Sequence, residues 1–496
     1  MTPTPEQEAV VKAISTSKDN LLIECPAGGA KTTLLVLACA KMYPQPLLAL
    51  AFNKRNADDL VKRLPQWVTC KTFNALGHAV WAKTSGHPRL NLDTRKIGKL
   101  VSEYVSANRM EDEAWDAIRQ LVDAARNAGA IPRGIAFQHT FGTVLNSSIW
   151  EELAFSVDVQ ARPEFTSAAE EILIKSILAA YSGTIDFSDQ IYMSVCFGGV
   201  FPKFATVMVD EAQDLSPMNQ EMLARSCAGR LIAVGDRYQG IYAFRGADSQ
   251  SIQTLIERFH LVPLSADTSF RCPKAVCEVA RKRHPRIVPF HTNPEGSVTR
   301  LEEWSTTSLK DHSVVLCRNN APLIGLAFKL IRSGRGVKLL GGDLSKGLNK
   351  ILSGLGPDTT ERLLALQAIS QWENRESTTA AGELKGAKLV RINDKAECLR
   401  ACFAAGVETI GEAKAFLTRI FNSDSGLITL STGHKSKGFE WKDVYILDPW
   451  RTPSRQAREA ERNGNFAPME QEKNLQYVMA TRAMENLYYI NMENLQ

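Results

Sequence analysis

The segment LLIECPAGGAKTT, residues 21–33, decides the fold class of this chain. An apolar strand runs into a loop of small residues, and a helical run from Leu34 to Met42 follows. In such a loop, backbone N–H groups at a helix N-terminus surround phosphate groups, a lysine reaches the β- and γ-phosphates and a hydroxyl binds Mg²⁺. We therefore expect a nucleotide and Mg²⁺ to bind here. The residues expected to hold them are Ala27, Gly28, Gly29, Ala30, Lys31, Thr32 and Thr33, with Lys31 acting also in catalysis and Thr32 as a metal ligand.

The loop departs from the strict phosphate-loop pattern at two positions. Cys25 and Ala30 stand where the pattern has glycine. If the loop needs a positive φ at Ala30, the alanine costs on the order of 1 kcal/mol, which several backbone contacts to phosphate can offset. A strand-to-helix turn of small residues without any ligand is the alternative interpretation.

A second segment, TVMVDEAQD at residues 206–214, is an apolar strand that ends in a cluster of acids. Two adjacent carboxylates at a strand end need a counter-charge. We expect Asp210 to hold Mg²⁺ through its water shell, and Glu211 to polarise the water that attacks the γ-phosphate. Taken alone, this segment is also compatible with an exposed acidic turn. Together with the loop, it predicts a nucleotide hydrolase.

A third segment, VGDRYQGIYAFRGA at residues 234–247, again follows an apolar strand. The amide of Gln239 is placed to sense the γ-phosphate. Tyr242, Phe244 and Arg245 offer flat faces and a fork of donors that suit stacking on single-stranded bases and gripping them. Aromatic residues at this spacing are also common in protein cores, which is the alternative.

Short apolar runs bounded by turn residues alternate with helical patterns along much of the chain. This alternation indicates buried parallel strands in an α/β architecture. The expected strands are residues 21–24, 47–52, 206–210, 231–235, 314–317, 428–431 and 444–447. Two stretches, residues 84–183 and 341–425, have helical patterns instead and are expected to be insertions.

Composition bounds the class of protein. A chain of 496 residues is too long for one hydrophobic core, so we expect two or more domains. Its 44% apolar and 23% charged residues are ordinary for a globular protein. No stretch approaches the ~20 apolar residues that span a bilayer, so we expect a cytoplasmic protein without a membrane partner. The ten cysteines lack metal-type spacing, and a net charge of +5 is too small to name a polyanionic partner.

The order of these segments, through nearly the whole chain, resembles the motif order of the UvrD/Rep-like helicases of superfamily 1, subfamily A. Further motifs of the family's first lobe are matched by TPEQ at residues 4–7, LAFNK at 50–54, TFNALG at 72–77 and IDFSD at 185–189. The resemblance implies that Gln7 reads the adenine edge and that Phe52 stacks on a DNA base. It also implies DNA contacts by Asn53, Thr72 and Asn74.

The family's second lobe is matched by LSADTSFR at residues 264–271, TGHKSKGFEW at 432–441 and NLQYVMATRA at 474–483. The resemblance implies that Arg271 and Arg482 are cations for the γ-phosphate. Phe270, where the family usually has tyrosine, would stack on adenine. Glu440 would accept a hydrogen bond from the ribose, and His434 would face the DNA.

The implied fold is α/β, with two RecA-like P-loop parallel-sheet domains that hold ATP between them, each with a mainly helical insertion. The first domain would comprise residues 1–83 and 184–263, with the helical insertion at 84–183. The second would comprise residues 264–340 and 426–496, with the insertion at 341–425. This second insertion is much shorter than in the large members of the family, where it regulates unwinding, so we expect such regulation to be reduced here.

The implied activity is that of an ATP hydrolase, with Mg²⁺, that moves 3′ to 5′ on single-stranded DNA and unwinds tailed duplex DNA. The polarity follows from residues 239–247, which lack the prolines that the subfamily of opposite polarity usually has after the glutamine. The compact form suits a phage-type or stand-alone bacterial enzyme, in the cytoplasm of a bacterial or phage-infected cell; protein partners stay open. A translocase that strips proteins from DNA and a nucleotide-gated binding module are the alternatives, whereas a small-molecule kinase would not need the aromatic segment.

Overall fold

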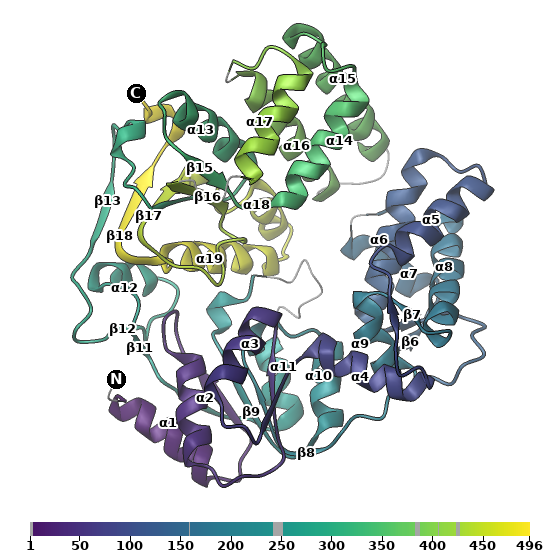
Figure 1. Cartoon of the computed structure of the whole chain (residues 1–496), viewed down its shortest axis with the longest axis vertical. Helices are drawn as coiled ribbons and strands as arrows, with labels where there is room; N and C mark the ends of the chain where they lie inside the picture. The colour runs from purple at the N-terminus through teal and green to yellow at the C-terminus, as the bar shows by residue number, and fades with distance from the viewer. Residues whose placement is uncertain (1–2, 158, 242–250, 382–386, 405, 423–426) are drawn as a thin grey trace. The chain divides into compact units, whose positions relative to one another are not determined.

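The computed structural model describes residues 3–157, 159–241, 251–381, 387–404, 406–422 and 427–496 (Figure 1). The chain forms two compact units. Unit 1 comprises Met1–Cys25 and Ala30–Ala266, and unit 2 comprises Pro26–Gly29 and Asp267–Gln496.

Unit 1 is built on a six-stranded sheet in which every pair of neighbours is parallel, in the order β10-β1-β9-β8-β2-β3. The strands are β1 (Leu21–Glu24), β2 (Leu47–Ala51), β3 (Val68–Thr72), β8 (Phe204–Val209), β9 (Cys227–Gly235) and β10 (Val262–Ser265). All five residues of β2 are buried, as expected for a strand that is covered on both faces.

Alternate residues of these strands belong to two different hydrophobic cores, one on each face of the sheet. Leu47 and Ala49 pack with residues of α1, α2 and α3, whereas Leu48 and Leu50 pack in the other core. The helices of the first face are α1 (Pro5–Thr16), α2 (Lys31–Lys41) and α3 (Lys54–Arg63). The core of the second face includes residues of α10 (Pro217–Ser226) and α11 (Ser251–Phe259).

The core of the second face continues into a long helical stretch between β3 and β8. Its helices are α4 (Phe73–Ser85), α5 (Lys96–Ala107), α6 (Asp112–Ala128), α7 (Ser147–Ser156), α8 (Pro163–Tyr181) and α9 (Phe187–Cys196). Short strands β4 (Asn91–Leu92) and β7 (Thr184–Ile185) pair with each other, as do β5 (Ala130–Ile131) and β6 (Thr143–Val144).

A buried charge network ties three of these helices together. Arg126 of α6 is 2% exposed, and its Nη1 lies 2.7 Å from Asp186 Oδ2 and 3.2 Å from Asp189 Oδ1. Lys96 of α5 pairs with Asp189 of α9 at 2.5 Å. Each charge in this cluster therefore has an opposite charge beside it, which buried ionic groups require.

Unit 2 contains a second six-stranded sheet with only parallel neighbours, in the order β13-β18-β17-β14-β16-β15. Its strands are β13 (Ser297–Arg300), β14 (Val314–Cys317), β15 (Val337–Leu339), β16 (Ile428–Thr432), β17 (Trp441–Leu447) and β18 (Ala483–Ile490). The shorter strands β11 (Thr268–Ser269) and β12 (Val288–Pro289) form a separate pair.

The helices of unit 2 fall into two groups. Those that connect strands of the sheet or flank it are α12 (Lys274–Ala280), α13 (Asn320–Arg332), α18 (Arg455–Arg462) and α19 (Ala467–Ala480). Between β15 and β16 lie α14 (Gly342–Leu355), α15 (Arg362–Ala381), α16 (Ala387–Ala404) and α17 (Ile410–Asn422), which Figure 1 shows grouped together. Leu399 and Phe403 of α16 share one core with Leu326 of α13, so this helical group packs onto the rest of the unit.

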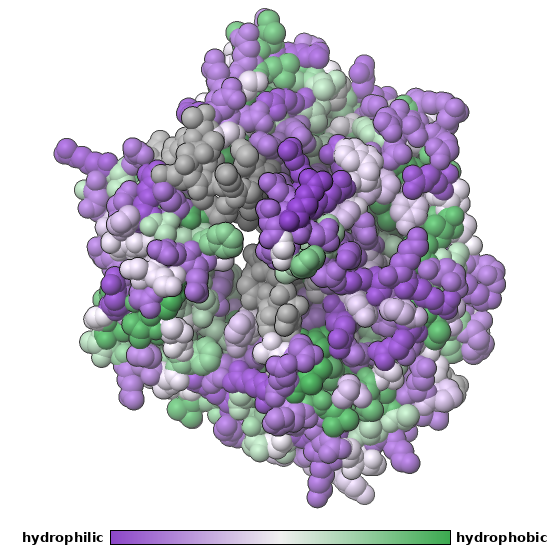
Figure 2. All heavy atoms as spheres, turned by 180° about the vertical axis from the view of Figure 1, so that it is seen from behind, coloured by the Kyte–Doolittle hydropathy of each residue, from purple (hydrophilic) through white to green (hydrophobic). Residues whose placement is uncertain are grey.

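The structure confirms all seven strands predicted from apolar runs, and it adds β3, β10, β13, β15 and β18 to the two six-stranded sheets. On the side of the molecule in Figure 2, hydrophilic residues predominate and hydrophobic residues form smaller groups. Within the described ranges, none of the helices has the length and the apolar character needed to cross a bilayer.

Candidate active site

Five of the segments that the sequence singles out in unit 1 follow carboxyl ends of strands of its six-stranded sheet. Because the strands are parallel, the ends of β1, β2, β3, β8 and β9 meet at one edge of the sheet. Ligands of open α/β sheets bind at this edge. The fold therefore gathers the phosphate loop, the acidic cluster and the expected DNA-contacting segments on one side of the sheet.

The phosphate loop turns tightly before helix α2. Gly29 N donates to Pro26 O at 2.9 Å, and Gly28 has a φ of +72°. Ala30 directly precedes α2 and has φ 57° and ψ 35°, which is the left-handed conformation. The loop therefore does need the positive φ at Ala30 for which the sequence analysis gave an energetic cost. A non-glycine residue in this region is strained, and such strain concentrates at functional sites.

Lys31 and Thr32, the first residues of α2, meet the two acids that follow β8. Lys31 Nζ lies 3.4 Å from Glu211 Oε2, and Thr32 Oγ1 donates to Asp210 Oδ2 at 3.2 Å. Glu211 also has a left-handed backbone, with φ 56° and ψ 45°. Four of the expected site residues of unit 1 are thus in contact as two pairs, Lys31 with Glu211 and Thr32 with Asp210.

Electrostatics in this cluster favour an additional cation. Burial lowers the pKa of Lys31, but the carboxylates of Glu211, Asp236 and Asp210 outweigh burial and raise it above its usual value. Burial and the nearby charge of Glu211 raise the pKa of Asp210 to about 6, against the opposing pull of Lys31. Several carboxylates therefore share one lysine, and the cluster is short of positive charge.

The donor set fits Mg²⁺ bound together with a nucleotide. Mg²⁺ prefers oxygen ligands and is usually held by one or two protein oxygens plus phosphates and water. The Thr32 hydroxyl and the Asp210 carboxylate supply such oxygens side by side. Among the described residues, no group of three or more His, Cys, Asp and Glu forms a metal cage of protein ligands alone.

A further residue, Gln213, connects this cluster to the end of β9. Its Nε2 donates to Glu211 Oε2 at 2.5 Å, and its Oε1 accepts from Asp236 N at 3.0 Å. Gln239 Nε2 in turn donates to Asp236 Oδ2 at 2.8 Å. We assigned no role to Gln213 from the sequence, although it stands inside the acidic segment.

The residue expected to read adenine, Gln7, caps its own helix. Thr4 N donates to Gln7 Oε1 at 3.1 Å, and Gln7 N donates to Thr4 Oγ1 at 3.3 Å, a reciprocal pair at the start of α1. The structure therefore gives Gln7 a local structural role, and its contact with adenine stays a prediction.

Three of the expected DNA-contacting residues make hydrogen bonds within unit 1. Asn53 caps α3 by accepting from Asn56 N, and Thr72 caps α4 by accepting from Ala75 N. Asn74 Nδ2 donates to the carbonyl oxygen of Phe187 at 2.8 Å.

Two aromatic side chains lie exposed in these segments. Phe52 is 37% exposed at the end of β2, and Phe187 is 55% exposed beside Asn74. The sequence includes Phe187 in the IDFSD segment, but only the fold brings it next to Asn74. The expected DNA contacts Tyr242, Phe244 and Arg245 lie outside the described residues.

The expected site residues of unit 2 converge from three segments. Arg271 Nε pairs with Glu440 Oε2 at 2.6 Å. Arg482 is 2% exposed, and it donates from Nε to Val478 O at 2.9 Å and from Nη1 to Phe439 O at 3.2 Å. The segments that contain Arg271, Glu440 and Arg482 are therefore neighbours within this unit.

The two remaining residues of unit 2 lie in different surroundings. The ring of Phe270 packs on that of Phe290, with ring centres 4.8 Å apart. His434 is half-buried in the turn that follows β16.

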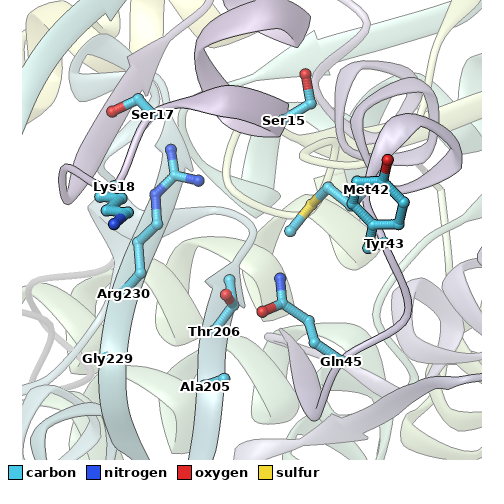
Figure 3. A pocket seen from close by; sticks show the side chains of 10 residues that line it. All are labelled: Ser15, Ser17, Lys18, Met42, Tyr43, Gln45, Ala205, Thr206, Gly229 and Arg230. Carbon is cyan, nitrogen blue, oxygen red and sulfur yellow. The ribbon is translucent and has the colours of Figure 1, made fainter.

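A cavity of about 460 Å³ lies away from the candidate site, at the amino-terminal ends of β8 and β9 (Figure 3). Thr206 and Arg230 line it from these two strands. The Arg230 guanidinium donates to the carbonyl oxygens of Ala13, Ile14 and Asp19. This arginine therefore closes the C-terminal end of α1, at the edge of the sheet opposite the phosphate loop.

Comparison with known proteins gives matches to two domains of one helicase family. The UvrD/REP helicase N-terminal domain matches residues 197–260, and the UvrD-like helicase C-terminal domain matches residues 384–494. The first match contains the acidic cluster and Gln239, and the second contains Glu440 and Arg482.

Several curated helicases are similar to the chain over long stretches. F-box DNA helicase protein 1 of Schizosaccharomyces pombe is 24% identical over 522 residues, which cover 98% of this chain and 57% of that protein. DNA helicase IV of Escherichia coli is 26% identical, over 62% of this chain and 51% of that protein. DNA helicase II of Escherichia coli is 22% identical, over 50% of this chain and 36% of that protein. The chain thus spans little more than half of the first two relatives, and less of the third.

The two domain matches follow each other in the family's order, and the curated similarities extend over both units. They confirm the predicted fold class, because the N- and C-terminal domains of this family are both RecA-like. These matches support the resemblance of the chain to the UvrD/Rep-like helicases.

Proposed function

We propose that this protein is an ATP-dependent DNA helicase or translocase that moves 3′ to 5′ along single-stranded DNA. The observation that carries the proposal is the cluster in which Lys31 meets Glu211 and Thr32 meets Asp210. A lysine and a hydroxyl at a helix N-terminus, facing two carboxylates at a strand end, are the groups that nucleotide hydrolysis requires.

Each group of this cluster has a role in the proposed reaction. Lys31 binds the β- and γ-phosphates, and Thr32 with Asp210 holds the metal ion. Mg²⁺, when bound, neutralises negative charge on the β- and γ-phosphates. Glu211 orients the attacking water and accepts its proton. Gln239 senses the γ-phosphate.

The second unit contributes the remaining nucleotide contacts in this proposal. Arg271 and Arg482 stabilise charge on the transferred phosphoryl group, as arginine fingers do. Phe270 stacks on adenine and Glu440 accepts from the ribose. We also propose that the helical stretches 84–183 and 341–425 are insertions in the two RecA-like domains.

Single-stranded DNA is the proposed track. Aromatic side chains stack on bases of any sequence, and polar groups hold the backbone. Phe52 and Phe187 supply exposed rings, and the latter is an addition to the residues expected from sequence. The other proposed DNA contacts are Asn53, Thr72, Asn74, Tyr242, Phe244, Arg245 and His434.

Unwinding of tailed duplexes tests activity and polarity together. With ATP and Mg²⁺, we expect strand separation from a duplex with a 3′ single-stranded tail and none from its 5′-tailed counterpart. Lys31→Ala should abolish both unwinding and hydrolysis, and Glu211→Gln should bind ATP without turning it over. Lys41→Ala, at the exposed far end of the same helix, is the matched control and should behave as wild type.

The two alternatives give different results in this assay. DNA-stimulated hydrolysis without unwinding from either tail would indicate a translocase that strips proteins from DNA. ATP binding that changes DNA affinity without stimulated hydrolysis would indicate a nucleotide-gated binding module. Unwinding from the 5′ tail alone would contradict the proposed polarity.

A further inference from the structure

Gln213 is buried between the acidic cluster and the end of β9, with 5% of its side chain exposed. The orientation of its amide follows from its partners. Asp236 N–H can only donate, so the oxygen Oε1 must face it, and Nε2 then faces the carboxylate of Glu211. Both ends of the amide are therefore in use, one on a candidate catalytic group and one on the backbone.

The end of β9 is shaped to admit this side chain. A Cβ atom at Gly235 would lie 2.7 Å from Gln213 Oε1 and 3.3 Å from Ala212 N. Real Cβ atoms do not approach so closely, so no other residue fits at position 235 unless Gln213 moves. The amide of Gln213 can therefore bridge Glu211 and Asp236 only because residue 235 has no side chain.

The hydrogen bonds continue from Asp236 into the segment that follows β9. The carboxylate of Asp236 accepts from Tyr238 N at 3.0 Å and from Gln239 Nε2 at 2.8 Å. An unbroken path of hydrogen bonds therefore joins Glu211 to Gln239 through Gln213 and Asp236.

Glu211 has a second partner, Lys31, with which it makes an ion pair at 3.4 Å. In the proposed function, Lys31 is needed by the phosphates of ATP. Gln213, in contrast, is held at both ends by protein groups, so it remains in place as the fixed partner of the Glu211 carboxylate.

The geometry points to Gln213 as a positioning residue that orients the Glu211 carboxylate and links it to Gln239. Through this link, the Glu211 carboxylate and Gln239 are held in one arrangement, on which the rate of ATP turnover depends. The inference rests on the proposed function and extends it: it names the residue that holds the proposed catalytic carboxylate in place.

Two substitutions at Gln213 distinguish the contributions of its two hydrogen bonds, one to Glu211 and one to Asp236. Gln213→Met has a similar volume and removes both hydrogen bonds, whereas Gln213→Glu keeps an acceptor for Asp236 N–H and loses the donor to Glu211. A hydrogen bond to a charged group typically changes an equilibrium or rate by about 10- to 100-fold. We expect both variants to lower kcat of the DNA-stimulated reaction by this factor, with the KM for ATP within about threefold of wild type.

Gln220→Met is the matched control, because Gln220 is also buried, 1% exposed, and lies on α10 of the same unit. This variant should shift the melting temperature without changing kcat or the stimulation by DNA. Binding of a fluorescent ATP analogue, together with circular dichroism, verifies that each variant is folded. If only Gln213→Met fails to fold, Gln213→Glu still decides the question.

A double-mutant cycle with Gln239→Met tests the link itself. If the two glutamines act through one path, Gln213→Met/Gln239→Met should turn over ATP no more slowly than the slower single variant, within about threefold. Multiplied effects of the two substitutions, or a kcat of Gln213→Met within twofold of wild type, would overturn the inference.

The wild-type protein separates this inference from the proposed function. If wild type hydrolyses ATP without stimulation by DNA, the proposed motor function fails, and the effect of Gln213→Met is then measured on the basal kcat. A lower basal kcat in Gln213→Met would then still support its positioning of Glu211.

Discussion

Ala30 holds a left-handed backbone immediately before helix α2, where a Cβ atom is unfavourable. For an L-residue this conformation costs roughly 1–2 kcal/mol, and glycine adopts it freely. Replacing Ala30 by glycine would relieve this strain, but glycine also raises the entropy of the unfolded chain. That entropy offsets about 0.4–1 kcal/mol of the stabilisation. The strain at Ala30 is therefore small against total stability but large enough to measure.

We predict that Ala30→Gly raises the free energy of unfolding by up to about 1 kcal/mol, measured by urea denaturation. Ala38→Gly is the control, because Ala38 is buried in the interior of the same helix, where glycine costs about 1 kcal/mol. Opposite signs for the two variants are the expected result. A loss of stability in both would show that the backbone at Ala30 carries no strain.

Glu211 has the same left-handed backbone and stands between Asp210 and the bridging Gln213. The sequence alone indicated Lys31, Thr32, Asp210 and Glu211. Each pair follows an apolar strand at a short distance in the sequence, so a short segment is enough to recognise it. Gln213 and Phe187 were missed because their contacts are not local. Gln213 forms a hydrogen bond with Asp236, which is 23 residues away in the sequence, and Asn74 forms one with Phe187, which is 113 residues away.

At the scale of elements, the helical stretch of unit 1 depends on its buried charge network. Burial raises the pKa of Asp186, but the Arg126 guanidinium outweighs burial and holds this pKa below its usual value. For Asp189, burial dominates and the pKa is raised. A carboxylate with a lowered pKa in the folded state adds stability above its unfolded pKa and loses it as the pH falls through the folded pKa.

We predict that Arg126→Met lowers the free energy of unfolding by about 3–5 kcal/mol at neutral pH, because it leaves the buried carboxylate of Asp186 without its main cation and leaves Asp189 with Lys96 alone. The loss should shrink as the pH falls and these carboxyl groups become protonated. Thermal unfolding between pH 7 and pH 5 measures this trend. Arg119→Met on the same helix is the control, since Arg119 is half-exposed and should change stability little. A pH-independent loss would exclude the electrostatic explanation.

The strands that the sequence predicted and those that it did not differ in their position within the sheets. The predicted strands β1, β2, β8, β9, β14, β16 and β17 lie inside a sheet, where both faces are covered and the residues are apolar in unbroken runs. Four of the missed strands, β3, β10, β13 and β15, lie at sheet edges. Edge strands need less burial, and β10 and β13 contain no buried residue, so they leave no apolar run in the sequence.

At the scale of the whole molecule, each unit has hydrophobic cores of its own, and each is expected to unfold in its own thermal transition. A ligand stabilises the native state that it binds, by about 2.7 kcal/mol at a concentration of 100 Kd. In the proposed function the nucleotide contacts Lys31 of unit 1 and the arginines of unit 2.

We therefore predict that a non-hydrolysable ATP analogue with Mg²⁺ raises the first transition in differential scanning calorimetry, by about 5–10 °C at 100 Kd, whichever unit unfolds first. Arg126→Met identifies the transition of unit 1, because it lowers that transition alone. In Lys31→Ala neither transition should respond to the analogue. If unit 2 unfolds first and its transition does not shift, the roles proposed for Arg271 and Arg482 are contradicted.

Successive side chains of β2 enter the two cores of unit 1 in turn, so each residue of the strand must face a particular side of the sheet. Leu47 and Leu48 face opposite sides of the sheet, so inserting one residue into the strand would send every following side chain to the wrong core. Strands of this kind tolerate changes of composition but not of length. The long helical stretch between β3 and β8 adds residues between strands, so it does not change which core each strand residue faces. Connections of this kind are where the fold can accommodate insertions.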